Sequence, residues 1–418
     1  MTYRDKQVIV LGAGRSGVAS AEFLRRRGAT VRMYDDRLLA DQGEELFCHT
    51  YDFAVISPGI PPSIHAVTRL KECGVPILSE LDLAYINSPS RHIVAISGTN
   101  GKTTTCRILF EMLSDKYPTH LVGNIGVPFI GEVESIDKKD VIVAEVSSFQ
   151  IEQSSCFRPE IAALTNLGED HLDRHKSAER YREIKKSLLL KAKKRVINAD
   201  DPHQSAMNGV RYSARDRGAD FAFINRKIIF EEKEYPLPEH SRGAGFDLDF
   251  LCAFAVASSF CGAKKSFCDV YDRVKIPSYR YEYIGELEGA KVYNDSKATN
   301  IDATLFAASL LNGSAAIILG GSDKGEDYAR LMKGLENRAD RFYLVGANAG
   351  DMYLAAREGM REKCRLMSDL DSCVRDFAQD PLEILLLSPA SASFDCYRNY
   401  EERGKCFDEI VRKYRAAD

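Results

Sequence analysis

The sequence predicts an α/β protein of three consecutive domains, and three observations support this prediction. The chain has 418 residues, too many for one hydrophobic core, because single domains usually hold about 100 to 200 residues. Short β-branched runs alternate with segments of helical spacing along much of the chain. Several of these runs end in glycine or polar residues, as parallel strands do where they deliver groups to a ligand.

The first domain, residues 1–88, begins with the βαβ pattern QVIVLGAG, VASAEFLRRRG and ATVRMYDD. Its first turn, Gly12-Ala13-Gly14-Arg15-Ser16-Gly17, has the G-x-G-x-x-G spacing of a dinucleotide-binding loop, and Asp35 follows at the end of the next strand. Such a turn suits NAD, but it also suits another phosphate-containing nucleotide or a purely structural role. The motif therefore predicts an anion-binding turn without identifying the ligand.

The second domain, residues 89–277, contains the most specific motif. The strand HIVAIS leads into Gly98-Thr99-Asn100-Gly101-Lys102-Thr103-Thr104-Thr105 and then into a helical segment. This order predicts a phosphate loop, in which Lys102 reaches the phosphates and the Thr103 hydroxyl ligates Mg²⁺. The loop departs from the usual pattern because Ile96 stands where the first glycine belongs. A glycine-rich turn with a surface lysine is the alternative.

Two acidic segments follow the phosphate loop at the ends of further strands. Glu145 ends VIVAE, and the run NLGEDHLDRH, which contains His171, follows IAALT. A carboxylate at a strand end beside a phosphate loop suits Mg²⁺, which prefers oxygen ligands. The alternatives are a capping or paired carboxylate for Glu145 and a helix-start histidine for His171.

The third domain, residues 278–418, follows the proline-containing turn IPSYRYE. Its predicted strands are KVYND, AAIILGGS, RFYLVGA and EILLLSPASAS, again with glycine or polar residues at their ends. The 57 Lys and Arg against 61 Asp and Glu give a net charge of -4, which does not favour nucleic acid as a partner. We also expect no membrane association and a cytoplasmic location, because no long apolar stretch and no C-x-x-C pair occurs.

Taken together, seven segments resemble the Mur ligases across essentially the whole chain: GTNGKTTT, GNIGVP, EVSSFQIE, NLGEDHLDRH, NDSKATN, GGSDKGEDY and LSPASASFD. The pairing of NDSKATN with LSPASASFD, together with AVISPGI, points to the member that adds D-glutamate. The resemblance implies a Rossmann-like N-terminal domain, a central P-loop ATPase-like domain with a parallel sheet, and a Rossmann-like C-terminal domain. It further implies ATP-dependent addition of D-glutamate to UDP-N-acetylmuramoyl-L-alanine through an acyl phosphate, by a monomer acting on small molecules in peptidoglycan synthesis.

The resemblance also assigns roles to individual residues. ATP would be bound by the phosphate-loop residues 98–104 and by Asp249, Arg280, Asp295 and Lys297. The acceptor would be bound by Ser16, Asp35, Asp36, Arg37, Ser57, Asn124 and Ser147. The D-glutamate pocket would comprise Thr299, Lys324, Ser393, Phe394 and Tyr400. Two Mg²⁺ ions would be held by Thr103, Glu145, His171 and Lys185, and the catalytic groups would be Lys102, His171, Lys185 and Lys297.

An ammonium cannot ligate Mg²⁺, so Lys185 needs a modification for that role. The matching lysine of the family lies four residues after a tyrosine and is carbamylated by CO₂; Tyr181 and Lys185 reproduce this spacing. A carbamate is an anionic oxygen ligand. The resemblance therefore implies a carbamylated Lys185.

Some positions depart from the family pattern. Asp249 stands where asparagine contacts adenine, Tyr279 where histidine is usual, Tyr400 where phenylalanine is common, and Gly168 replaces a hydroxyl residue. Other readings remain: another amide ligase of the superfamily, adding L-alanine or resembling folylpolyglutamate synthetase, an NAD-dependent oxidoreductase, or a nucleotide-binding protein without turnover.

Overall fold

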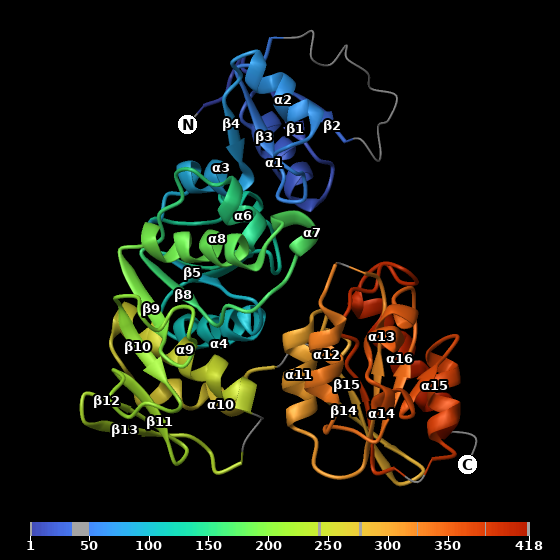
Figure 1. Cartoon of the computed structure of the whole chain (residues 1–418). Helices are drawn as coiled ribbons and strands as arrows, with labels where there is room; N and C mark the ends of the chain where they lie inside the picture. Colours follow the sequence, from blue (N-terminus) through green and yellow to red (C-terminus); the bar gives the residue numbers. More distant parts are fainter. Residues whose placement is uncertain are drawn as a thin grey trace. The chain divides into compact units, whose positions relative to one another are not determined.

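The computed structural model describes residues 2–35, 50–240, 244–275, 278–323, 325–380 and 382–415. The chain divides into two compact units, which Figure 1 shows in ribbon form. The first unit comprises residues 1–167 and 182–275, and the second comprises residues 168–181 and 276–418. The second unit thus combines the C-terminal residues with a short segment from the middle of the chain.

A four-stranded parallel sheet forms the N-terminal part of the first unit. Its strands are β1 (Gln7–Leu11), β2 (Thr30–Tyr34), β3 (Phe53–Ile56) and β4 (Ile77–Ser79), in the order β2-β1-β3-β4. The accompanying helices are α1 (Arg15–Arg26), α2 (His65–Glu72) and α3 (Glu80–Asn87). Alternate residues of β1 face opposite sides, since Val8 packs in the cluster of Phe23 and Ile9 in the cluster of Leu70.

A nine-stranded sheet forms the rest of the first unit, in the order β13-β12-β11-β10-β9-β8-β5-β7-β6. Its strands are β5 (Ile93–Ser97), β6 (Thr119–Gly123), β7 (Val141–Glu145), β8 (Ile161–Leu164), β9 (Lys194–Asn198), β10 (Val210–Ser213), β11 (Phe221–Ile224), β12 (Lys227–Phe230) and β13 (Lys233–Pro236). The strands from β11 to β6 are parallel, and β12 and β13 are antiparallel. Strand β5 lies between β7 and β8, so the loops after these three strands meet at one edge.

The helices around this sheet are α4 (Lys102–Ser114), α5 (Phe129–Glu132), α6 (Ser148–Gln153), α8 (Ala178–Lys191), α9 (Ala244–Cys261) and α10 (Val270–Arg273), with a 3₁₀ turn at Lys265–Phe267. Helix α8 crosses the division between the two units at residues 181 and 182. Helices α4 and α9 pack against each other, and the α4 side chains Ile108, Leu109 and Met112 are buried. This packing fixes the start of α4 relative to α9.

The second unit contains a six-stranded sheet in the order β14-β15-β19-β16-β17-β18. Its strands are β14 (Glu282–Leu287), β15 (Ala290–Asn294), β16 (Ala315–Leu319), β17 (Arg341–Leu344), β18 (Cys364–Leu366) and β19 (Ile384–Leu387), and only the β14–β15 pair is antiparallel. The helices are α7 (Leu172–His175), α11 (Ile301–Ser309), α12 (Tyr328–Leu335), α13 (Ala349–Ala355), α14 (Glu358–Arg361), α15 (Leu370–Phe377) and α16 (Tyr400–Arg415).

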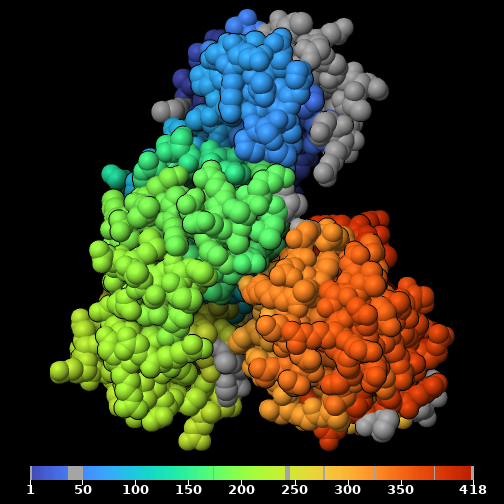
Figure 2. Space-filling model, viewed as in Figure 1, coloured from blue at the N-terminus to red at the C-terminus, as the bar shows by residue number. Residues whose placement is uncertain are grey.

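Both faces of the six-stranded sheet are covered. On one face, Ile317 belongs to a buried cluster with Leu331 of α12, whereas its neighbour Ile318 packs on the other face with Val374 of α15 and Phe407 of α16. In the space-filling view, the C-terminal residues of this unit, coloured orange to red, form one continuous surface (Figure 2). A sheet buried on both faces leaves the ends of its strands, and the loops there, for ligand contacts.

The α/β architecture with mainly parallel sheets, expected from the sequence, is confirmed. The antiparallel strands β12 and β13 were not expected. They are joined to their neighbours by two-residue turns with positive φ, Asn225-Arg226 and Glu231-Glu232, which lack the usual Asn-Gly signal of such turns. Among the described residues, no helix is both long enough and apolar enough to span a membrane.

Candidate functional site

The predicted phosphate loop lies between β5 and the start of α4, in the middle of the parallel part of the nine-stranded sheet. Gly98 and Gly101 have φ values of 140° and 82°, which residues with side chains rarely adopt. A Cβ at Gly98 would lie 1.9 Å from Thr165 Oγ1, and one at Gly101 would lie 2.1 Å from Asp249 Oδ1. Both glycines are therefore required by conformation and by space.

The loop is held by residues at the end of the neighbouring strand β8. Asn166 accepts a hydrogen bond from Asn100 N on its Oδ1 at 2.9 Å, and its Nδ2 donates to Asn100 O at 3.2 Å. Thr99 N donates to the Asn166 carbonyl at 2.9 Å. These bonds fix the loop conformation, so that the N-terminus of α4, where backbone N–H groups lack helical partners, faces out of the loop as an anion site.

Two lysine side chains meet at the same carbonyl of this loop. Lys102 Nζ donates to the carbonyls of Gly98 and Thr99 at 2.9 and 2.7 Å. Lys185, which comes from α8 and is only 2% exposed, donates to the Gly98 carbonyl at 2.7 Å and to Ser97 Oγ at 3.3 Å. Two ammonium groups beside a helix N-terminus favour a ligand with several negative charges. The residues present therefore fit a polyphosphate.

Glu145 ends β7, the other neighbour of β5, and brings a carboxylate to the loop. Its side chain is 2% exposed and accepts hydrogen bonds from Thr103 Oγ1 at 2.8 Å and from Asn124 Nδ2 at 2.9 Å. A carboxylate and a hydroxyl are oxygen donors that suit Mg²⁺, which usually keeps several waters and phosphate oxygens as its other ligands. Among the described residues, no group of three or more histidine, cysteine or acidic side chains could hold a metal by itself.

Ser147 lies two residues after Glu145 and has a structural role. Its Oγ accepts from Gln150 N at 3.2 Å, and its backbone N donates to Gln150 Oε1 at 2.9 Å, which forms a capping box at the start of α6. The hydroxyl predicted to contact the acceptor therefore fixes the loop after β7 in this structure.

His171 lies in the second unit, at the start of α7, with a left-handed φ of 54°. Its Nε2 is 3.6 Å from Asp170 Oδ2, and Asp170 is buried and contacts Asn300 Nδ2 at 3.4 Å. The preceding Glu169 donates its backbone N–H to Asp302 at 3.2 Å. These contacts tie the segment with His171 to the end of the NDSKATN motif and the start of α11, within the second unit.

The glycine-rich turn after β1 is close-packed. A Cβ at Gly17 would lie 1.8 Å from the Gly12 carbonyl oxygen. Helix α1 can therefore pack this closely against the turn only because residue 17 is glycine. Asp35 Oδ2 accepts a hydrogen bond from Ala13 N at 2.7 Å, and Ser57 Oγ donates to Gly12 O at 3.4 Å. Asp35 and Ser57 thus border the turn, together with the partly exposed Ser16. Asp36 and Arg37, predicted for the same ligand, lie outside the described residues.

The residues predicted for the ATP end of the second unit lie around the loop after β15. Asp295 is buried, and burial raises its pKa to about 7 although Ser388 Oγ and Tyr281 N donate hydrogen bonds to it at 2.9 and 3.1 Å. Arg280 Nε is buried and lacks a hydrogen-bond partner among the described residues. A buried unpaired donor normally has a ligand or water partner, so Arg280 fits a role toward an anion.

Three of the residues predicted for the D-glutamate pocket lie on the loops after β15 and β19. Lys297 Nζ lies 3.6 Å from the centre of the Tyr400 ring, a close cation–π contact. Ser393 is 2% exposed, whereas the next residue, Phe394, is 73% exposed. Thr299 donates its backbone N–H to the Lys297 carbonyl at 2.9 Å. Lys324, the predicted carboxylate-binding cation, lies outside the described residues.

Sequence reasoning missed Arg403, the buried arginine of α16. Its guanidinium donates to Ser296 Oγ at 3.0 Å, to the Ser296 carbonyl at 2.9 Å and to the Ser391 carbonyl at 3.0 Å. Burial lowers its pKa to about 10, which leaves it charged near neutral pH. No sequence signal distinguishes it from the surface charges of YEERGKCF, but it joins the loops after β15 and β19. Asn166, which holds the phosphate loop, is the first residue of the NLGEDHLDRH motif but was not among the predicted site residues.

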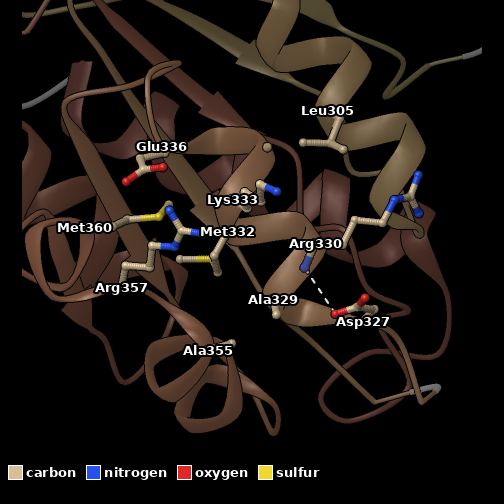
Figure 3. Close-up of a pocket in the computed structure, with 11 residues that line it drawn as sticks. Leu305, Asp327, Ala329, Arg330, Met332, Lys333, Glu336, Ala355, Arg357 and Met360 are labelled. Carbon is tan, nitrogen blue, oxygen red and sulfur yellow. Dashed lines mark hydrogen bonds between the residues drawn. The ribbon is translucent and has the colours of Figure 1, made fainter.

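A groove of about 620 Å³ lies elsewhere on the second unit, between α11, α12 and α14 (Figure 3). Leu305, Met332 and Met360 contribute its apolar lining, and Arg330 and Arg357 contribute cations. None of the residues predicted for ATP, acceptor or D-glutamate lines this groove. It is therefore separate from the candidate site.

Comparisons with known proteins agree with the geometry of the phosphate loop. The model of the Mur ligase middle domain matches residues 96–242, and that of the Mur ligase glutamate ligase domain matches residues 279–390. A UDP-N-acetylmuramoylalanine–D-glutamate ligase of Pelotomaculum thermopropionicum is 36% identical, with 98% of each chain covered. The enzyme of the same name from Koribacter versatilis is 34% identical, with 99% of this chain and 98% of that protein covered.

Solved structures show the same fold at low sequence identity. A pseudomurein peptide ligase type C from Methanothermus fervidus has a TM-score of 0.63 at 18% identity, covering 98% of this chain and 100% of that one. The MurF ligase of Thermotoga maritima, solved in complex with ADP, also has a TM-score of 0.63 at 18% identity, covering 98% of this chain and 96% of that one. With full-length relatives above 30% identity and both family models matched, the chain belongs to the Mur ligase family.

Proposed function

We propose that the chain is an ATP-dependent ligase that joins D-glutamate to UDP-N-acetylmuramoyl-L-alanine in peptidoglycan precursor synthesis. The observation that carries this proposal is the phosphate loop, where Lys102 and Lys185 meet at the Gly98 carbonyl and Thr103 binds Glu145. An ATP-dependent amide ligase needs such a site for phosphoryl transfer. The names of the full-length relatives supply the substrates.

In this reaction a carboxylate oxygen of the acceptor attacks the γ-phosphorus of ATP, and ADP leaves. The D-glutamate nitrogen then attacks the carbon of the acyl phosphate, inorganic phosphate leaves, and the amine loses a proton. The protein contributes mainly position and charge, because both steps develop negative charge on oxygen. Bound Mg²⁺ would neutralise phosphate charge, held by Thr103 and Glu145, while Lys102 donates hydrogen bonds to the phosphates.

The second metal site requires a change of Lys185. Its Nζ lies beside the phosphate loop on the Gly98 carbonyl, where an ammonium cannot ligate a cation. Reaction of the neutral amine with CO₂ forms an N–C bond, releases one proton and leaves an anionic carbamate, which can bind Mg²⁺ together with His171. Two Mg²⁺ ions and a carbamylated Lys185 are therefore part of the proposal.

The remaining predicted residues divide between the substrates. Asp249, Arg280, Asp295 and Lys297 are assigned to ATP, together with the phosphate-loop residues. The acceptor is assigned to Ser16, Asp35, Asp36, Arg37, Ser57, Asn124 and Ser147, and D-glutamate to Thr299, Lys324, Ser393, Phe394 and Tyr400. The position of Asp249 beside Gly101 supports a role near the nucleotide, because α9 brings its carboxylate to the end of the phosphate loop.

We further propose that the chain is organised as an acceptor-binding Rossmann-like domain of residues 1–88, a central ATP-binding domain of residues 89–277 and an amino-acid-binding Rossmann-like domain of residues 278–418. The separate four-, nine- and six-stranded sheets support this division. A monomer in the cytoplasm would suffice, because small-molecule substrates require no second chain.

Phosphate release from ATP tests the function directly. The purified protein is incubated with ATP, Mg²⁺ and UDP-N-acetylmuramoyl-L-alanine, and the amino acid is varied among D-glutamate, L-glutamate, D-aspartate, L-alanine and glycine. We expect release only when acceptor and D-glutamate are both present, with a product heavier by one glutamyl residue in mass spectrometry. Release with UDP-N-acetylmuramate and L-alanine instead would reassign the chain to another ligase of the family.

A further inference from the structure

Three loops meet at the carboxyl edge of the sheet in the second unit because β19, β16 and β17 are neighbouring parallel strands. The loop after β16 contains Gly320 to Asp323 and leads to Lys324. The loop after β19 contains Ser391 and Ser393, and the loop after β17 contains Asn348. Under the proposed function the first two loops carry the groups for the D-glutamate carboxylates, but no role has been assigned to the third.

Asn348 joins the other two loops, and Tyr328 at the start of α12, through three hydrogen bonds of its side-chain amide. It is fully buried, and its Oδ1 accepts from Gly321 N at 2.8 Å. Its Nδ2 donates to Ser391 Oγ and to Tyr328 Oη, each at 2.8 Å. Because a backbone N–H can only donate, Gly321 determines which end of the amide is oxygen.

Tyr328 extends this connection to the residues on either side of position 324. Its hydroxyl donates to Asp323 Oδ1 at 2.6 Å, and the same oxygen accepts from Gly325 N at 2.9 Å. The Asp323 carboxylate therefore joins Gly325 N to the Tyr328 hydroxyl, and Tyr328 links it to Asn348. Burial raises the pKa of Tyr328, which keeps its hydroxyl protonated and able to donate.

The backbones of the two loops are also in direct contact, so a displacement of one is transmitted to the other. Ser322 N donates to the Ala392 carbonyl at 2.9 Å, and Phe394 N donates to Ser322 Oγ at 3.1 Å. A Cβ at Gly321 would lie only 2.1 Å from the Ala392 carbonyl. Such close packing leaves little room for either loop to shift alone.

We propose that Asn348, assisted by Tyr328, is a positioning residue that sets the distance between the Asp323 loop and the Ser391–Phe394 loop and thereby the fit of the amino-acid substrate. This inference rests on the proposed function, because the substrate groups on the two loops come from it. It adds that the selectivity for the amino acid depends on a buried amide that touches no substrate itself.

The test compares Asn348→Leu, which keeps the size but removes all three hydrogen bonds, with Tyr328→Phe, which removes the hydroxyl bonds to Asp323 and Asn348 but keeps the bonds of Asn348 to Gly321 and Ser391. Tyr343→Phe is the matched control, because Tyr343 is also buried in the second unit and its hydroxyl also donates to an aspartate, Asp380, at 3.4 Å. Steady-state kinetics give kcat and KM for ATP, acceptor and D-glutamate separately.

We expect Asn348→Leu to raise the KM for D-glutamate about ten-fold, since an unpaired buried N–H displaces the loop, while the KM values for ATP and acceptor stay within about two-fold. Tyr328→Phe should raise the D-glutamate KM less, and Tyr343→Phe should leave it unchanged. Hydrogen exchange of the free variants should accelerate in the peptides around 320–323 and 391–394. If Asn348→Leu does not fold, Tyr328→Phe against Tyr343→Phe provides the same comparison.

An unchanged D-glutamate KM in a folded Asn348→Leu variant, or an equal rise in the KM of all three substrates, would overturn the inference. Exchange that accelerates equally throughout the second unit would do the same, because it would indicate a general loss of stability. The amino-acid preference of the parent enzyme tests the proposed function separately from this inference. If the parent uses another amino acid, the function is wrong, and the same comparison is then made with that amino acid.

Discussion

The phosphate loop of the first unit and the amino-acid loops of the second unit differ in how the chain assembles them. The phosphate loop consists of eight consecutive residues, Gly98 to Thr105, between one strand and one helix. The amino-acid loops, which the proposed function assigns to D-glutamate, follow β15, β16 and β19 and are joined by Asn348 and Arg403. The comparison shows that consecutive residues form the backbone of the phosphate loop, with Asn166 and Lys185 as distant supports, whereas the loops assigned to D-glutamate come from separate parts of the chain.

The same difference extends to the type of interaction. At the phosphate loop, charge is concentrated by two ammonium groups on one carbonyl, and a flexible polyphosphate can adjust to them. In the second unit, the Asn348 amide and two hydroxyl groups connect the loops at 2.8 Å, and the Arg403 guanidinium joins them through bonds of 2.9 and 3.0 Å. Under the proposed function, we therefore expect charge to provide affinity for ATP in the first region and fixed separation to provide selectivity for the amino acid in the second.

The largest effect is expected for Lys102→Ala. This side chain is partly exposed and donates to loop carbonyls, so its removal should leave the fold intact and lower phosphate release by at least about 100-fold. Phosphate release and circular dichroism are measured together. Lys138→Ala, at an exposed lysine away from the loop, is the control. Near-normal release by Lys102→Ala would remove the phosphate loop from the mechanism.

Lys324→Ala should impair catalysis almost as strongly, but through one substrate. Loss of the cation leaves a D-glutamate carboxylate without its partner, which raises the KM for D-glutamate by about ten-fold or more, with little change for the acceptor. Separate titrations of the two substrates measure this. Equal rises in the KM values for D-glutamate and for the acceptor would mean that the role of Lys324 is not specific to the amino acid. The contrast between the two regions would then not hold.

Carbamylation of Lys185 should be visible without turnover. The enzyme is equilibrated with ¹³C-labelled bicarbonate slightly above neutral pH, and the carbamate carbon is observed by NMR. Lys185→Arg should lack this resonance, and Lys186→Arg, one residue further along α8, should retain it. A parent spectrum without the resonance would leave Lys185 an ammonium, as its contact with the Gly98 carbonyl already allows.

Glu145→Gln should weaken Mg²⁺ binding moderately. The substitution keeps the shape of the side chain but replaces the carboxylate, a good ligand for Mg²⁺, with a neutral amide. We expect the Mg²⁺ concentration for half-maximal activity to rise about ten-fold. Glu160→Gln, at a carboxylate that pairs with the exposed His92, is the control. An unchanged Mg²⁺ titration would assign Glu145 to the hydrogen bonds with Thr103 and Asn124 alone.

The smallest effect on activity is expected for Glu80 of α3, which belongs to neither region and affects the free energy of unfolding alone. Burial raises its pKa from 4.5 to about 7, although Ile130 N donates a hydrogen bond to it. Because the folded state holds the proton more tightly, the stability contributed by this group is present below pH 4.5 and is lost as the pH rises toward 7.

Relative to Glu80→Gln, the parent should therefore lose about 3 kcal/mol of unfolding free energy between pH 4.5 and pH 8, at 1.36 kcal/mol per pKa unit. Urea unfolding of both proteins at several pH values measures the difference. Parallel stability curves would show that Glu80 ionises normally in the folded protein.

The order of strands and helices could largely be predicted from the sequence, because apolar periodicity reports which faces are buried. The phosphate loop was also visible there, since glycines, lysine and threonines must be consecutive to place helix N–H groups and a cation on one anion. Glu145 could be predicted for the same edge because parallel strands end together. In contrast, the antiparallel turns Asn225-Arg226 and Glu231-Glu232 lack the glycine that usually marks the second position of such turns.

Only the tertiary structure decided which distant residues hold the loops. Asn166 supports the phosphate loop because β8 is the neighbour of β5, and Arg403 and Asn348 connect loops that are up to about a hundred residues apart. A single arginine or asparagine has the same sequence appearance on a surface as in a buried network. Its role depends on burial and on unpaired partners elsewhere in the fold, and neither is encoded by its immediate neighbours.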